Sequence, residues 1–287
     1  MPINELRKRQ LFSLEAFPPK KEQSAKSIYE AVSKMARLHP DYMSVTYGAG
    51  GSDIQQQVTV DLVKHIQNCG VAPLAHITCI NSSLEQVDRM LDRLEEAGVH
   101  SVLALRGDKV EGGVLKPPFL HASDLIAHIA KRGGFEIFAA CYPEGHPDSD
   151  GVEDDVTYLK KKVDAGASGL ISQLFFDNAD FYRMRELCAQ AGIRVPIAAG
   201  IMPVVNAAQV QRMGTMCGAK LSPKFSKMIA RYDGNPQALY DAGINYAIDQ
   251  VTDLLASGVD GIHVYAMNNP DVASRIFDAV HNLLMTA

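Results

Sequence analysis

Apolar residues recur along the chain in two alternating patterns. Short runs rich in β-branched and aromatic residues predict strands, and the longer segments between them repeat their apolar positions with helical spacing. The predicted strands span residues 11–17, 42–48, 72–79, 101–107, 135–142, 169–176, 196–202 and 261–267. Strands that alternate with helices predict a parallel sheet, because each helix returns the chain to the edge where the next strand starts.

The helical segments carry recognisable start and stop residues. Residues 83–98 (SLEQVDRMLDRLEEAG) begin with Ser83, a good N-cap, and end on Gly98. The segment 219–234 (AKLSPKFSKMIARYDG) predicts an extra short helix before the last long helix and the last strand. Helices are therefore expected between all the predicted strands.

The number of strand–helix units favours one architecture. Eight such units in about 250 residues are typical of a TIM barrel. We therefore predict an α/β fold, a single (β/α)8 TIM barrel that forms one domain over residues 1–287. An open, doubly wound parallel sheet is the alternative, but the G-x-G-x-x-G dinucleotide fingerprint and the Walker A motif are absent from the sequence.

Composition and charge exclude some classes of protein. Hydrophobic residues make up 47% of the chain and charged residues 21%, as in ordinary globular proteins. The net charge is −5 with both signs interspersed, so no basic patch marks a nucleic acid or an anionic membrane as partner. No apolar run approaches the roughly 20 residues of a membrane-spanning helix.

The five cysteines show neither metal-binding spacing nor an even number for pairing. Such thiols are typical of proteins from reducing compartments. The start of the chain, MPINELRKRQ, is not followed by the apolar segment of a signal peptide. We therefore expect a cytoplasmic protein.

Polar residues stand where the predicted strands end. The strands of a parallel barrel end at one rim, and the active sites of such barrels lie there. Glu15 interrupts the apolar run LFSLEAF. If it faces the barrel mouth, loss of water raises its pKa and suits it to act as a general acid. A carboxylate paired with Lys or Arg, or exposed at a sheet edge, is the alternative.

Three further groups of residues allow two interpretations each. Asp108 follows Arg106 closely, so a guanidinium would keep that carboxylate ionised, or the two would form a loop salt bridge. His76 and His146 are candidate metal ligands, but no partner stands at a ligand spacing, and we expect no metal. The glycines of residues 48–52 suit either a phosphate-binding turn or a flexible loop.

Eight motifs, in order along residues 11–268, resemble one known family. They are LFSLEAFPPK, SVTYGAGGS, AHITC, ALRGD, YPEGHP, KKKVDAGA, ISQLFFD and GIMPV. Together they are similar to the methylenetetrahydrofolate reductases, over a length similar to the catalytic barrel alone.

The resemblance implies a noncovalently bound FAD in the barrel mouth and a ping-pong reaction. NADH or NADPH would reduce the flavin and leave, and 5,10-methylenetetrahydrofolate would then accept hydride and become 5-methyltetrahydrofolate. It implies that Glu15 and Asp108 are catalytic, and that Glu15, Thr46, Gln173 and Gln209 contact substrate. The residues implied to bind FAD are Thr46, Tyr47, Ala49, His76, Arg106, Gly107, Asp108, His121, Ala122, Tyr142, His146, Asp155 and Lys162.

The sequence also departs from the family. Met213 and Asn269 stand where relatives carry a substrate-stacking Phe and a substrate-binding Arg, and Tyr158 replaces an Asn near the FAD. A homo-oligomer is expected, and the departures keep open a subunit that needs a partner electron donor. A lyase or aldolase that uses Glu15 and Lys162 without flavin is the remaining alternative.

Overall fold

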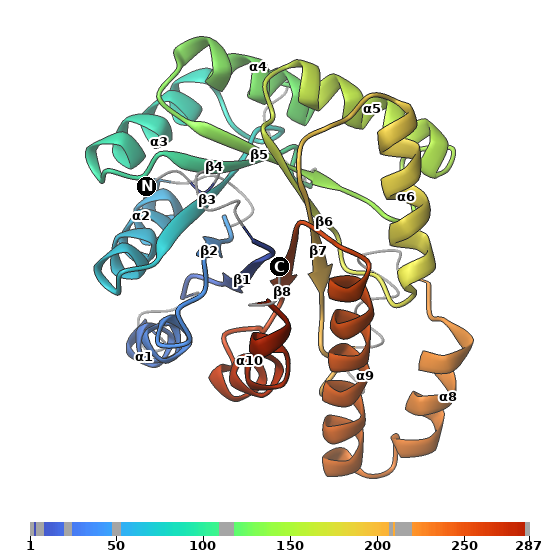
Figure 1. Cartoon of the computed structure of the whole chain (residues 1–287). Coiled ribbons are helices and arrows are strands. Elements are labelled where there is room, and N and C mark those ends of the chain that lie inside the picture. The colour runs from blue at the N-terminus through green and yellow to red at the C-terminus, as the bar shows by residue number, and fades with distance from the viewer. Residues whose placement is uncertain are drawn as a thin grey trace.

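Eight parallel strands close into a barrel in the order in which they follow along the chain (Figure 1). The computed structural model describes residues 3, 9–19, 25–47, 53–108, 118–206, 209 and 220–284, without the side chains of residues 53–55. The strands are β1 (Leu11–Ala16), β2 (Tyr42–Val45), β3 (Ala72–Thr78), β4 (Ser101–Leu105), β5 (Glu136–Cys141), β6 (Gly169–Ser172), β7 (Ile197–Ile201) and β8 (Gly261–Val264). The predicted barrel is confirmed, and the open sheet is wrong because β1 pairs with β8.

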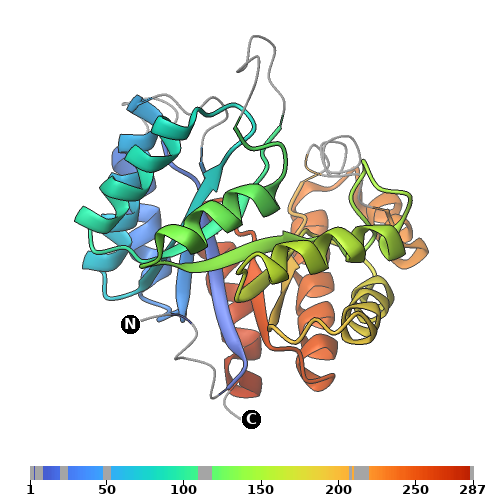
Figure 2. The ribbon, with the colours of Figure 1, turned by 90° about the horizontal axis from the view of Figure 1, so that it is seen from above.

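Helices surround the strands, and Figure 2 shows them on both sides of the barrel. They are α1 (Ala25–Ala36), α2 (Asp53–Asn68), α3 (Leu84–Glu96), α4 (Ala122–Arg132), α5 (Val152–Asp164), α6 (Asn178–Gln190), α8 (Pro223–Tyr232), α9 (Pro236–Ala256) and α10 (Pro270–Leu284). Every strand lies within its predicted range, and each ends one to four residues before that range does, where the chain leaves the ladder for the loop. None of the helices in the described ranges is long and apolar enough to cross a membrane.

The predicted helix boundaries follow from local hydrogen bonds. Ser83 caps α3: its hydroxyl accepts from the amide of Gln86 at 3.3 Å, and the Gln86 side chain accepts from the amide of Ser83 at 2.7 Å. This reciprocal pair satisfies two amides that a helix leaves free at its start. The extra helix is confirmed as α8, which lies against α9 on the side away from the strands (Figure 1).

The inside of the barrel changes character along its axis. An apolar layer fills the end where the strands start; its members are Ile3, Tyr42, Leu74, Leu103, Phe138 and Ile171. Further along, the buried residues are polar: Ser13, Glu15, Ser44, His76 and His263. Because a dry interior penalises such groups, the polar half points to a site at the rim where the strands end.

Candidate active site

Glu15 and His76 meet inside the barrel. Oε2 of Glu15 lies 3.7 Å from Nε2 of His76, although β2 separates their strands, so both side chains point inward. Burial raises the pKa of Glu15 to about 8 and lowers the pKa of His76 to about 3. Both groups are therefore mostly uncharged at pH 7, and the contact is not an ion pair. Nε2 of His76 is buried and has no hydrogen-bond partner in the part of the chain that the structure describes.

A layer of hydrogen-bonded side chains lies around this pair. Nδ1 of His263 lies 2.8 Å from the Ser13 hydroxyl, and the Tyr265 hydroxyl donates to the Ser172 carbonyl at 2.7 Å. The Tyr265 side chain passes over Gly200 of β7. A Cβ added at Gly200 would lie 2.2 Å from the Ser172 carbonyl oxygen and 2.7 Å from the Tyr265 ring. A glycine is required there because the ring and the backbone occupy the space of any side chain.

A cavity of about 270 Å³ opens at the same rim, between the ends of β4 and β5 and the helices α4 and α5. Its lining includes seven residues predicted to bind FAD, namely Arg106, His121, Ala122, Tyr142, His146, Asp155 and Lys162. Four further polar residues of the lining were not predicted from the sequence to bind FAD, namely Ser123, Asp148, Ser149 and Lys161. The one sequence feature that could have indicated them is that they stand close to motif residues along the chain. Loop and helix residues lack the alternation of inward and outward side chains that marks strand positions.

Basic side chains give this cavity its character. Lys162 donates to the carbonyl of Ala140 at 2.9 Å, and its ammonium lies 5.9 Å from the centre of the Tyr142 ring. Burial lowers the pKa of Lys162, and the nearby Asp155 carboxylate opposes that shift. Arg106 forms its ion pair with Asp148 at 2.7 Å. The interpretation of Arg106 and Asp108 as a loop salt bridge is therefore wrong: the guanidinium turns toward the loop after β5.

The other predicted residues lie around the rim. Thr46 and Tyr47 follow β2, and Gln173 follows β6, where its side chain accepts from the amide of Leu174 at 2.9 Å. Asp108 is exposed after β4, and the side chain of Gln209 accepts from the amide of Val205 at 2.8 Å. Three sequence predictions fall outside the described residues: Ala49, the glycine turn of residues 48–52 and Met213.

Gly107 shapes the turn that carries Asp108. Its φ is +80°, a conformation that favours glycine, and an added Cβ would lie 2.9 Å from the Cβ of Thr78. The chain therefore turns close against the end of β3 and places Arg106 and Asp108 at the rim.

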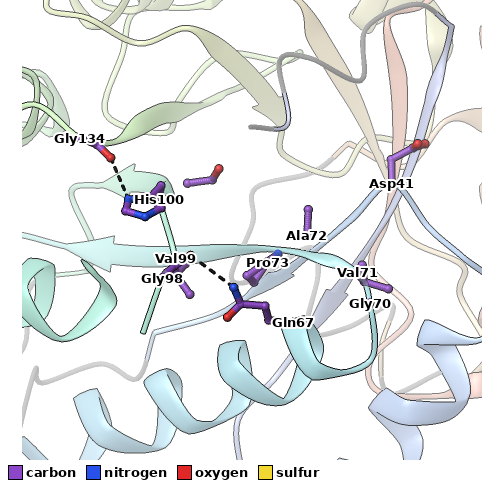
Figure 3. Close-up of a pocket in the computed structure, with 11 residues that line it drawn as sticks. Asp41, Gln67, Gly70, Val71, Ala72, Pro73, Gly98, Val99, His100 and Gly134 are labelled. Carbon is purple, nitrogen blue, oxygen red and sulfur yellow. Dashed lines mark hydrogen bonds between the residues drawn. The ribbon is translucent and has the colours of Figure 1, made fainter. Parts of the chain in front are cut away.

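A larger cavity lies at the opposite end of the barrel (Figure 3). It has a volume of about 610 Å³ and is lined by residues at the starts of β3 and β4. Its polar groups already have partners: Asp41 accepts from Arg9 and from the amide of Phe12, each at 2.8 Å, and His100 lies 3.1 Å from the Gly134 carbonyl. Volume alone does not make an active site, so we assign the chemistry to the opposite rim.

Metal ligands do not gather at either end within the part of the chain that the structure describes. No group of three or more His, Cys, Asp or Glu side chains there is arranged to hold a metal ion.

The fold and the rim define a class: a parallel barrel with a buried acid beside a cavity lined by basic side chains. The chain belongs to the methylenetetrahydrofolate reductase family, whose sequence model matches residues 3–281. The resemblance seen in the motifs is thus confirmed.

Curated relatives agree with this assignment. The chain is 34% identical to 5,10-methylenetetrahydrofolate reductase of Pectobacterium carotovorum subsp. carotovorum, over 96% of this chain and 91% of that protein. The Escherichia coli (strain K12) protein of that name is 32% identical, over 92% and 88%. Methylenetetrahydrofolate reductase (NADH) 1 of Arabidopsis thaliana is 36% identical over 90% of this chain, which spans only 46% of the plant protein.

Solved structures support the fold alone, because their sequence identities are low. A protein from Clostridium thermocellum that binds two copies of 5-methyl-5,6,7,8-tetrahydrofolic acid matches with a TM-score of 0.66 and 14% identity, over 99% of this chain and 98% of that one. Dihydropteroate synthase from Thermus thermophilus matches with a TM-score of 0.50 and 12% identity, over 97% and 94%.

Proposed function

We propose that this protein reduces 5,10-methylenetetrahydrofolate to 5-methyltetrahydrofolate, with FAD as cofactor and NADH or NADPH as electron donor. The observation that carries the proposal is the Glu15 carboxyl, which is buried at the barrel rim and holds its proton at neutral pH because burial raises its pKa to about 8. A neutral carboxylic acid is what protonation of a folate nitrogen requires.

The residues at the rim fit a flavin dinucleotide. Arg106, Lys161 and Lys162 line the cavity and suit a pyrophosphate, which carries the opposite charge. The unpartnered Nε2 of His76 offers a hydrogen bond to a polar part of a ligand. Bound there, the flavin would supply the redox centre that accepts hydride from the nicotinamide and passes it to the folate.

Glu15 acts on the folate. Its proton goes to one of the two ring nitrogens that hold the methylene carbon, and the bond between that nitrogen and the carbon breaks, with the bonding electrons left on the nitrogen. The lone pair of the second nitrogen forms a double bond to the carbon, and this iminium accepts hydride. The low-dielectric interior keeps the proton on Glu15 until substrate arrives, because no charged partner within the described residues stabilises the carboxylate: His76, its titratable neighbour on β3, is itself neutral.

Other rim residues orient the substrates. Asp108 stands exposed beside the cavity. Burial raises the pKa of Tyr142 and lowers the pKa of His146, and the Asp108 carboxylate adds a smaller electrostatic contribution that favours the protonated form of each. From that place it suits contact with both the flavin and the folate. Gln173 and Gln209 are proposed to bind the folate from the other side of the mouth.

An anaerobic titration tests the proposal. The purified protein is expected to be yellow, to lose its flavin absorption when NADH or NADPH is added, and to regain it with methylenetetrahydrofolate. A protein that stays colourless and binds no added FAD would overturn the proposal in favour of a flavin-free barrel enzyme.

The same titration tests a dependence on a partner donor. Asn269 accepts from the amides of Asp271 and Val272 at 3.1 and 3.3 Å, so this position serves the start of α10 rather than carrying a cation toward the substrate. A flavin that dithionite reduces but nicotinamides do not, and that methylenetetrahydrofolate reoxidises, would identify a subunit that takes electrons from another protein.

A further inference from the structure

The strand that closes the barrel ends in an unusual backbone. Met267 and Asn268, just beyond β8, have φ values of +55° and +54°. Residues with side chains seldom adopt this left-handed conformation, because the Cβ crowds the following carbonyl, although Asn tolerates it better than most. Such strain persists only where surrounding contacts hold it, so the contacts of Asn268 are informative.

The Asn268 side chain makes two hydrogen bonds to one residue, Phe17, which lies just beyond the end of the neighbouring strand β1. Its Oδ1 accepts from the amide of Phe17 at 2.9 Å, and its Nδ2 donates to the carbonyl of Phe17 at 2.8 Å. The side-chain amide of Asn268 thus takes the place of the backbone amide and carbonyl that a neighbouring strand would offer to Phe17. The two residues are 251 positions apart in sequence.

This pair of bonds lies where the backbone ladder between β1 and β8 has stopped. The ladder runs from Leu11–Gly261 to Leu14–Val264 and does not include Glu15. Glu15 pairs only on its other side, with Ser44 of β2. On the β8 side, Glu15 therefore lies between the last ladder pair, at Leu14, and the Asn268 bonds, at Phe17.

We infer that Asn268 is a positioning residue: its two bonds to Phe17 fix the end of β1 and thereby hold the Glu15 carboxyl inside the barrel. This inference rests on the proposed role of Glu15 as the acid of the folate step. Within the described part of the chain, no hydrogen bond holds the Glu15 carboxyl itself, and Nε2 of His76 is 3.7 Å away. Its place depends on the backbone on either side.

The groups around Glu15 predict how its pKa changes if the end of β1 becomes loose. Among the described residues, the titratable groups that face it are His76 from β3 and Tyr265 just after β8. His263 bonds to the flanking Ser13 and Ser44, and the described residues of β2 present no charge. Desolvation is the cause that raises the pKa of Glu15. If the end of β1 loosens, water enters and that pKa falls toward its usual value.

The test uses two variants that both lose the Asn268 side chain but differ in how easily their backbone adopts a positive φ. Asn268→Gly removes both bonds and adopts positive φ without strain, and Asn268→Ala removes them and adds strain. Stopped-flow measurements on the FAD-loaded proteins follow flavin reduction by NADH and flavin reoxidation by methylenetetrahydrofolate between pH 6 and 9. Reoxidation in both variants is expected to slow about tenfold or more at pH 7.5, with flavin reduction within about twofold of wild type.

The pH profile separates positioning from a general loss of structure. The pH above which reoxidation declines is expected to move down by about one unit or more in both variants. The control is Asn235→Ala, which removes the N-cap of α9, where the Asn235 side chain accepts from the amide of Ala238 at 3.1 Å, far from Glu15 in sequence. It is expected to leave both the rate ratio and the profile unchanged.

Two results would overturn the inference. One is an Asn268→Gly protein with wild-type reoxidation and an unshifted profile. The other is a parallel loss of both half-reactions, which would indicate a purely structural role. If Asn268→Ala does not fold, Asn268→Gly still gives the answer, because glycine relieves the backbone strain. Failure of the wild-type protein to bind FAD or reduce folate would instead reject the proposed function.

Discussion

The two ends of the barrel are built from the same eight strands and differ in almost every chemical respect. At the end where the strands start, apolar side chains such as Leu74 and Phe138 fill the interior, and the polar groups around the neighbouring cavity have partners (Figure 3). At the other end, Glu15 and His76 are buried without hydrogen bonds between them, beside a cavity lined by basic residues. The first end contributes packing to the fold, and the second holds the buried polar groups to which we assign the chemistry.

The largest expected effect comes from removing the acid at the reactive end. Glu15→Gln keeps the shape of the side chain and removes the transferable proton. Reoxidation of the reduced flavin by methylenetetrahydrofolate is expected to slow by about 100-fold or more, while flavin reduction by NADH stays within about twofold. Stopped-flow absorbance measures both, and an equal loss of the two would reject Glu15 as the proton donor.

A substitution at the opposite end is expected to act on stability alone. Leu74 is fully buried in the apolar layer, so Leu74→Ala leaves a cavity and should lower the free energy of unfolding by about 2–5 kcal/mol. Urea denaturation measures this change, and Leu84→Ala, at an exposed position of α3, is the control. A changed ratio of the two half-reactions in Leu74→Ala would show that the two ends are not independent.

The pH dependence of stability gives a third contrast. The pKa of Glu15 is raised in the folded state to about 8 from 4.5, so the folded protein holds a proton that the unfolded chain releases. Its stabilising contribution is complete below about pH 4.5 and is lost as the pH rises through 8. Glu15→Gln apoprotein is therefore expected to match wild type near pH 4.5 and to exceed its free energy of unfolding by about 2–4 kcal/mol near pH 8.

His76 and His263 act in the opposite direction and cancel in that comparison. Burial lowers their pKa values to about 3, so their contribution is lost as the pH falls below 6.5, equally in both proteins. A constant difference between Glu15→Gln and wild type across pH 4.5 to 8 would contradict a buried, neutral Glu15.

The smallest effect is expected within the cofactor cavity. Lys162→Met retains the length of the side chain and removes its charge, so the dissociation constant of FAD should rise about tenfold, measured by flavin fluorescence on the apoprotein. Lys160→Met is the matched control on the same helix, because Lys160 pairs with Asp164 and is not among the residues that line the cavity. Equal FAD affinity in the two variants would remove Lys162 from the proposed site.

Periodicity and caps made much of the fold predictable. The alternation of strand and helix patterns placed all eight strands within their ranges, and Ser83 and Gly98 marked the limits of α3, because these signals act between residues close in sequence. The position of Glu15 in an apolar strand was likewise visible as an unusual charge. Arg106 was recognised as a rim residue, but its partner Asp148 was not, since a salt bridge between two loops leaves no periodic trace.

The sequence by itself determined the strands, their parallel arrangement and hence the single rim at which their polar ends gather. Only the tertiary structure decided that Glu15 faces His76 across β2 and that Asn268 holds Phe17 from the far end of the chain. The reason is that closing the barrel joins the first strand to the last. Contacts across that seam and across the interior depend on register and side-chain direction in three dimensions, which no local pattern of residues specifies.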